Sequence, residues 1–135
     1  MTRILKGGCL CGKVRYSVKD EFRLFYLCHC IQCRKITGSA HASNLFTEKK
    51  NLDWTAGQSL TRQFEFPRRE FTTVFCTLCG SGLPFPSTDG QSIIIPAGSL
   101  DEEPTIKPLR NIFWEEHVQW FDAGVNAPHV TGFKA

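Results

Sequence analysis

Three features are missing from this sequence, and each absence excludes a class of protein. No apolar run reaches the roughly 18 residues that a membrane-spanning helix needs, so we expect no membrane partner. Residues 1–8 lack the apolar core of a signal peptide, so we expect a cytoplasmic protein whose thiols stay reduced. No run of basic residues exceeds two, so the formal net charge of +3 forms no stripe that would predict nucleic-acid binding.

The composition predicts one packed domain. The chain has 135 residues, which suits a single domain over residues 1–135. Hydrophobic residues make up 41% and include 11 phenylalanines, so a core can form and disorder is not expected. No repeat, low-complexity tract or linker divides the chain, and no feature predicts an oligomeric state.

Short β-prone segments between glycines and prolines predict an all-β fold with little helix. Val14, Tyr16 and Val18 alternate with polar residues, which is the pattern of a half-buried strand. Further strands are expected over residues 22–27, 39–47, 51–55, 60–66, 71–75 and 91–95, with one or two final strands in residues 109–121. The best candidate for a helix is one or two turns after Cys30.

All seven cysteines fall in three clusters: Cys9 and Cys11; Cys28, Cys30 and Cys33; and Cys76 and Cys79. An odd number of thiols fits a disulfide framework badly, and in a reducing compartment clustered cysteines indicate metal binding or catalysis. Structural zinc sites use four protein ligands, whereas catalytic zinc sites use three and keep one position open. Seven thiols therefore divide into one site of each kind.

The two outer clusters predict the structural site. Cys9 and Cys11 are followed by Gly12, and Cys76 and Cys79 by Gly80. A glycine there can adopt a positive φ, which lets the chain turn around an ion with its amides directed at the sulfurs. Four thiols from two such turns would join the first strand to the strand ending near residue 76. The alternative is four buried free cysteines that act as small hydrophobic residues.

The central cluster predicts the catalytic site. Cys28, Cys30 and Cys33 can reach one zinc ion from a single loop, and the fourth position could bind a thiol or polarise a carbonyl. The alternative is a closed structural site completed by a histidine, although His29 lies between two ligand positions and should point away. Arg34 and Lys35 follow the cluster and could hold a substrate carboxylate, or they could belong to a solvated turn.

Two other uses of the cysteines remain open. Cys30 and Cys33 could pair with Cys76 and Cys79 in a zinc ribbon, which would leave three thiols over. Cys30 and Cys33 could also act as a redox dithiol, which firm zinc binding would prevent because coordination occupies both thiolates.

Three motifs together resemble the glutathione-dependent formaldehyde-activating enzyme family, which includes centromere protein V. The motifs are Gly8-Cys9-Leu10-Cys11-Gly12-Lys13-Val14-Arg15-Tyr16, then Cys28-His29-Cys30-Ile31-Gln32-Cys33-Arg34-Lys35 with Gly38, and Phe75-Cys76-Thr77-Leu78-Cys79-Gly80. They occur in the family's order and spacing, and the resemblance covers residues 7–121. One departure is that family members often carry a histidine where Asn111-Ile112-Phe113 stands here, which bears on the substrate more than on the fold.

The resemblance implies a zinc-stabilised β-tent of twisted antiparallel sheets and two zinc ions per chain. It implies a structural zinc on Cys9, Cys11, Cys76 and Cys79, and a catalytic zinc on Cys28, Cys30 and Cys33. The implied activity is that of a carbon–sulfur lyase, with glutathione as co-substrate, that interconverts S-(hydroxymethyl)glutathione with glutathione and formaldehyde, or handles a related small thiol and aldehyde. The alternative function is a non-catalytic, zinc-dependent binding module on the same fold.

Overall fold

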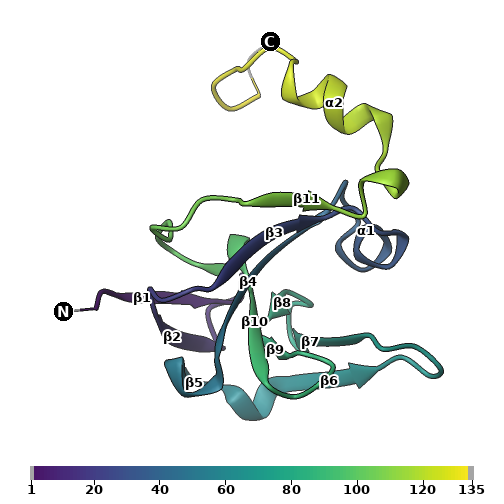
Figure 1. Cartoon of the computed structure of the whole chain (residues 1–135). Coiled ribbons are helices and arrows are strands. Elements are labelled where there is room, and N and C mark those ends of the chain that lie inside the picture. The colour runs from purple at the N-terminus through teal and green to yellow at the C-terminus, as the bar shows by residue number, and fades with distance from the viewer. Residues whose placement is uncertain (1, 134–135) are drawn as a thin grey trace.

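Three small sheets and two α-helices make up the part of the chain that the computed structural model describes, residues 2–133 (Figure 1). The predicted all-β class with little helix is confirmed. Each α-helix has seven residues, and 3₁₀ turns add four short segments. Within the described residues, no helix has both the length and the apolar character needed to cross a membrane.

The first sheet holds the N-terminal part of the chain. Its antiparallel strands have the order β1 (Ile4–Gly8), β2 (Arg15–Lys19) and β5 (Leu52–Ala56). Val14, Tyr16 and Val18 are buried, as their alternation predicts. The strand β1 was not predicted, because only Leu5 and Gly7 of its five residues are buried and the segment has no clear alternation of hydrophobic and polar side chains.

The second sheet is the largest and carries the central cysteines. Its order is β11 (Arg110–Ile112), β3 (Leu24–Cys28), β4 (Ala42–Glu48), β10 (Ser92–Pro96) and β9 (Phe85–Pro86). β3, β4, β10 and β9 pair antiparallel, whereas β11 lies parallel to β3 with Ile112 opposite Cys28. This parallel edge departs from the expected antiparallel pattern, and it brings a segment distant in sequence beside the end of β3.

The third sheet is a hairpin with one added strand. β6 (Thr61–Glu65) pairs antiparallel with β7 (Thr72–Cys76), and β7 pairs with β8 (Gly82–Leu83). A turn over residues 66–71 joins β6 to β7, where the sequence predicts it. Because β7 ends at Cys76, the hairpin delivers the last cysteine pair.

Two core clusters join the sheets. The larger one lies between the first and second sheets and contains Leu5, Tyr16, Val18, Phe25, Leu45, Ile93 and Ile95. The smaller one joins the first sheet to the third and contains Val14, Val74 and Leu83 together with Cys9 and Cys76. Burial of apolar surface therefore positions two of the outer cysteines, of which Cys9 directly follows β1 and Cys76 ends β7.

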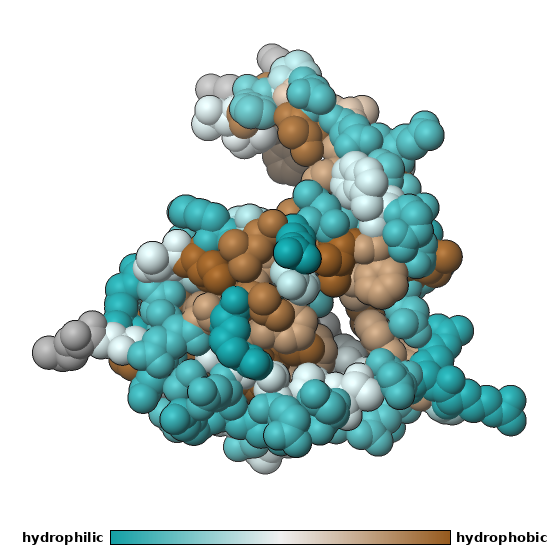
Figure 2. Space-filling view, in the orientation of Figure 1, coloured by the Kyte–Doolittle hydropathy of each residue, from teal (hydrophilic) through white to brown (hydrophobic). Residues whose placement is uncertain are grey.

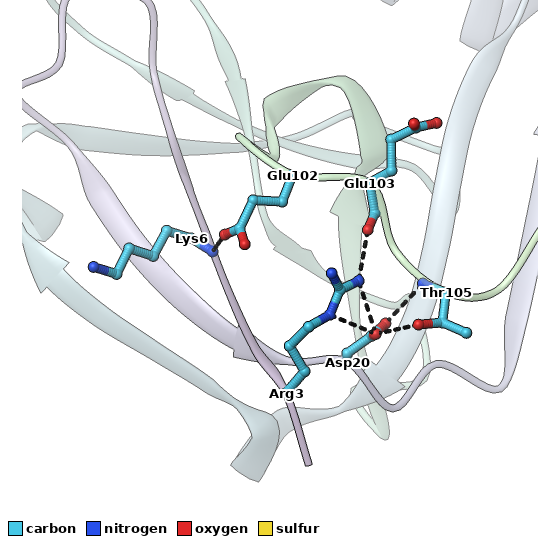
Figure 3. Close-up of polar contacts among 6 residues, drawn as sticks. All are labelled: Arg3, Lys6, Asp20, Glu102, Glu103 and Thr105. Carbon is cyan, nitrogen blue, oxygen red and sulfur yellow. Dashed lines mark hydrogen bonds and ion pairs between the residues drawn. The ribbon is translucent and has the colours of Figure 1, made fainter.

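A buried carboxylate fastens the edge of the first sheet to residues 101–105 (Figure 3). Asp20 accepts hydrogen bonds from Arg3 Nη2 at 3.1 Å, from the Thr105 amide at 3.1 Å and from Thr105 Oγ1 at 2.6 Å. Arg3 also donates to the carbonyl of Glu103 at 2.7 Å. The side chain of Asp20 is only 6% exposed, so these contacts compensate for its lost hydration.

The C-terminal region differs from its prediction. Residues 109–121 were expected to form one or two strands, but only Arg110–Ile112 does so. Phe113 then adopts a left-handed conformation with φ 54°, a 3₁₀ turn covers Trp114–Glu116, and α2 covers Gln119–Val125. Trp114 and Trp120 have the large apolar rings that are common in buried strands, but both lie exposed beyond the end of β11.

Candidate metal centres

The structure gathers the four outer cysteines into one group. The Sγ atoms of Cys9, Cys11, Cys76 and Cys79 all lie within 4.8 Å of one another. The Cys9–Cys11 and Cys11–Cys76 sulfur separations are 3.5 and 3.9 Å. A tetrahedral zinc ion with bonds of about 2.3 Å places its sulfurs about 3.8 Å apart, so this donor set fits zinc.

Both outer cysteine pairs lie in turns closed by a left-handed glycine. Gly12 and Gly80 have φ of 80° and 79°, which confirms the positive φ predicted for them. The Gly12 amide donates to the carbonyl of Cys9 at 3.1 Å, and the Gly80 amide donates to that of Cys76 at 2.8 Å. The Val14 amide donates to Cys9 Sγ at 3.3 Å, which is the kind of bond that stabilises a thiolate ligand.

The three central cysteines form a second, separate group. The Sγ atoms of Cys28, Cys30 and Cys33 lie within 4.8 Å of one another, and all three residues are buried. Among residues 2–133, no histidine, aspartate or glutamate completes this group. The zinc ribbon that would pair Cys30 and Cys33 with Cys76 and Cys79 is not formed, and all seven cysteines are free of disulfides.

The end of β3 and the start of α1 (Ile31–Thr37) position this group. Cys28 is the last residue of β3, Cys30 is the N-cap of α1, and Cys33 lies in the first turn of the helix. Cys30 Sγ accepts a hydrogen bond from the Cys33 amide at 3.3 Å. Gly38 ends α1 in a left-handed conformation, as a C-terminal cap does. The predicted short helix after Cys30 is therefore confirmed.

Each cluster holds a thiol that loses its proton easily. A hydrogen bond from the Cys33 thiol lowers the pKa of Cys28 to about 6, and the same contact raises the pKa of Cys33. In the outer cluster, a hydrogen bond from Ser81, whose Oγ lies 3.2 Å from Cys79 Sγ, lowers the pKa of Cys79 to about 5. A thiolate in each cluster at neutral pH favours the binding of a cation.

His29 points away from the sulfurs into a cluster of aromatic rings. Its Nε2 donates to Asn111 Oδ1 at 2.8 Å, its side chain is fully buried, and its Nδ1 has no partner. The ring centroids of Trp114 and Phe121 each lie 5.0 Å away. The expected orientation of His29 is confirmed, but the sequence did not indicate its contact with Asn111.

A cleft of about 930 Å³ connects the two candidate centres. Cys33 and Phe71 line it beside the central cluster, and Cys9 and Ser81 line it beside the outer cluster. Phe71 also packs against the buried cluster that the central cysteines form with Ala42. A small molecule bound in this cleft could reach the central sulfurs through Cys33. No local motif indicates the cleft, because its wall comes from all three sheets.

The structure places Arg34 and Lys35 on α1, beside the central cluster in sequence. Lys35 is exposed and Arg34 is partly buried. The helix side that faces the cleft carries Cys33, Ile36 and Thr37. The cleft is lined instead by other charged groups, namely Arg15, Glu70 and Asp101, of which Arg15 forms an ion pair with Asp101.

Two comparisons with known proteins give matches for this chain. A solved structure of a Rhodobacter sphaeroides protein superimposes with a TM-score of 0.59 at 21% sequence identity, covering 76% of this chain and 91% of that one. At this identity the similarity shows the fold alone. No curated protein matches the chain. The sequence model of the glutathione-dependent formaldehyde-activating enzyme matches residues 4–116, which include all seven cysteines, and the chain therefore belongs to this family.

Proposed function

We propose that the protein is a zinc-dependent carbon–sulfur lyase that interconverts S-(hydroxymethyl)glutathione with glutathione and formaldehyde, or acts on a related small thiol and aldehyde. Membership of the family supports glutathione and formaldehyde as reactants. One observation of the structure carries the proposal: three buried thiols without a fourth protein ligand in residues 2–133 lie at the side of a large cleft. Such a donor set suits a zinc site with an open position.

The four outer cysteines would hold a structural zinc, and the three central cysteines would hold a catalytic one, two ions per chain. A zinc ion at the central site would supply Lewis acidity and lower the pKa of a thiol that reaches its open position. In the splitting direction, the adduct loses its hydroxyl proton, the carbon–sulfur bond breaks to give formaldehyde, and the sulfur takes up a proton to give the free thiol. The reverse direction forms the same bond without any oxidant or reductant.

The residues of the chain would bind and orient the reactants. Ile36, Thr37 and Phe71 line the cleft beside Cys33 and would surround the reacting carbon and sulfur. Burial of Cys28, Cys30 and Cys33 would limit competition from water. Arg34 and Lys35 lie next to Cys33 on α1 but outside the lining of the cleft, and their positive charge would attract the carboxylates of the thiol substrate toward this end of it.

The test compares Cys30→Ser with the wild type. We expect the wild type to accelerate exchange between free glutathione and its formaldehyde adduct, followed by NMR exchange spectroscopy. We expect the variant to lose this acceleration and one of two zinc ions while keeping its circular dichroism spectrum. Equal exchange in both proteins would contradict the proposal for this substrate. The control is Gln32→Ala, which changes the residue next to Cys33 on α1 but leaves all seven thiols intact, and it should keep the exchange activity and both zinc ions.

A second measurement separates an enzyme from a binding module. Zinc per chain is determined by elemental analysis before and after incubation with millimolar glutathione and desalting. A fall from two ions to one supports a central site that exchanges with thiols. Two ions that persist, together with no acceleration of exchange, would favour the non-catalytic binding module.

A further inference from the structure

The cleft that connects the two candidate centres has an ion pair in its wall. Arg15 is the only basic residue among the described residues that line the cleft, and its Nη2 donates to Asp101 Oδ2. Figure 2 shows the molecule hollowed between α1 and the third sheet, and both contribute to the lining of the cleft. An anionic group that enters the cleft therefore meets one cationic side chain in its wall, and that side chain already holds a carboxylate.

The ion pair lies at the end of the cleft next to the outer cysteines. The side chain of Arg15 crosses Gly8, which directly precedes Cys9, and a Cβ on Gly8 would lie 2.9 Å from Arg15 Cδ and Nη1. Cys33 lines the cleft beside the central cluster. A ligand that contacts both the central sulfurs and the ion pair must therefore extend along the cleft, with its sulfur at one end and its charged groups at the other.

The backbone around Asp101 is held in place by the first sheet. The Asp101 amide donates to the carbonyl of Lys6 at 2.8 Å. Two residues earlier, Ser99 Oγ lies 2.6 Å from the hydroxyl oxygen of Tyr16, which is buried in the core. Because these contacts fix the segment that carries Asp101, a ligand bound by this carboxylate does not have to order the loop first.

Both partners of the ion pair have unused hydrogen-bonding atoms. Among residues 2–133, Arg15 Nε and Nη1 have no acceptor, and Asp101 Oδ1 has no donor. A lone carboxylate is attracted weakly by this pair, because Asp101 repels it while Arg15 attracts it. A zwitterionic α-amino acid group gains from both sides, since its carboxylate pairs with Arg15 and its ammonium group with Asp101.

We propose that Arg15 and Asp101 bind the zwitterionic α-amino acid end of the thiol substrate and thereby select thiols that carry a γ-glutamyl group. This inference rests on the proposed function and assigns the residues that recognise the thiol. A γ-glutamyl group places its α-ammonium and α-carboxylate several bonds from the sulfur, as a ligand extended along the cleft requires. Cysteine carries both groups next to its sulfur, and simple thiols lack them, so the ion pair discriminates against both.

The test uses isothermal titration calorimetry of the full-length, zinc-loaded protein with two thioethers. S-methylglutathione has no thiol proton to lose, so its binding reports on recognition in the cleft and not on the reaction. The second ligand is the same molecule with its α-ammonium group replaced by hydrogen. We expect the wild type to bind S-methylglutathione at least about tenfold more tightly, because the second ligand loses a charge-assisted hydrogen bond to Asp101.

Two variants separate recognition from a structural role of the ion pair. Asp101→Asn should weaken the binding of S-methylglutathione at least about tenfold without weakening that of the desamino ligand. Arg15→Met should weaken both, since both ligands keep the α-carboxylate. The two affinities are compared on the same protein, so a less stable variant still reports the preference. The controls Asp53→Asn and Arg62→Met remove the same charges at exposed positions outside the cleft and should keep the wild-type preference.

Three outcomes would overturn the inference: no binding of S-methylglutathione, equal binding of the two ligands by the wild type, or an equal loss for both ligands in Asp101→Asn. The exchange assay of the proposed function gives an independent result. A protein that prefers S-methylglutathione but does not accelerate exchange would refute the lyase activity and keep this binding site. A protein that accelerates exchange without the preference would refute the binding site alone.

Discussion

His29 Nε2 lies 2.8 Å from Asn111 Oδ1, and this hydrogen bond ties the loop of the three central cysteines to β11. Since His29 is fully buried, loss of its acceptor leaves a polar N–H without a partner. We expect Asn111→Ala to lower the free energy of unfolding by about 1–3 kcal/mol. Chemical denaturation of the zinc-loaded protein measures this change.

Asn126→Ala is the control for that substitution, because Asn126 is exposed and, among the described residues, makes hydrogen bonds only to residues 122–124 of α2. Asn111→Asp keeps an oxygen acceptor and should recover most of the lost stability. An Asn111→Ala protein as stable as the wild type would show that the bond contributes nothing measurable.

Loss of one cysteine should have different effects in the two clusters. Cys76 is fully buried between the first and third sheets, so under the proposal that the outer cysteines hold a structural zinc, Cys76→Ser should prevent stable folding, because such an ion contributes on the order of 10 kcal/mol. Cys33→Ser should remove one zinc and leave the fold intact. Thermal melting and elemental zinc analysis of both variants check this, and similar melting curves for the two would contradict it.

Asp20 should make the stability of the protein depend on pH. Burial raises the pKa of its carboxyl group, but hydrogen bonds from Thr105 and Arg3 outweigh burial and lower the pKa below its usual 3.8. A carboxyl group with a lowered pKa stabilises the fold fully above its unfolded pKa, and this contribution is lost as the pH falls through the folded value. The wild type should therefore be more stable than Asp20→Asn at neutral pH, and the difference should shrink toward about pH 3.

Urea denaturation at both pH values measures this difference. The matched control is Asp53→Asn, which removes a carboxylate from the same sheet at an exposed position. A difference that stayed constant between the two pH values would show that the charge of Asp20 is not responsible.

Gly57 should tolerate no side chain. It adopts φ 71°, and an added Cβ would overlap the carbonyl oxygen of Lys13. We expect Gly57→Ala to cost more than about 1 kcal/mol, because the left-handed conformation and the overlap are both unfavourable. Gly98→Ala is the control, since Gly98 has no positive φ and open space around it. Thermal melting of the two variants should separate them, and equal melting temperatures would contradict the prediction.

The local parts of the fold and of the site could be predicted from the sequence. The alternation at Val14, Tyr16 and Val18 predicts burial correctly, because strand periodicity is a short-range property. The spacing of the cysteines and their following glycines predicts which thiols the structure brings together. These signals depend on a few adjacent residues and need no knowledge of the tertiary fold.

Features that depend on distant contacts were not predicted. The parallel pairing of β11 with β3 joins residues more than eighty positions apart, and nothing in the local sequence indicates it. Trp114 and Trp120 are large apolar residues of the kind found in cores, but both lie on the surface, and the strands expected around them do not form. The contact between His29 and Asn111 was not predicted either, because the two residues are 82 positions apart in the sequence.

The sequence separation of the two cysteine groups has a consequence for biosynthesis. The central group has all three of its cysteines once a few more than thirty residues have left the ribosome. The outer group has all four only after Cys79 has left the ribosome as well. The entropic cost of closing a loop rises with its length, so the nascent chain can capture an ion at the central cluster long before the outer one exists. The ion at the outer site would then be acquired last and would complete the joining of the first and third sheets.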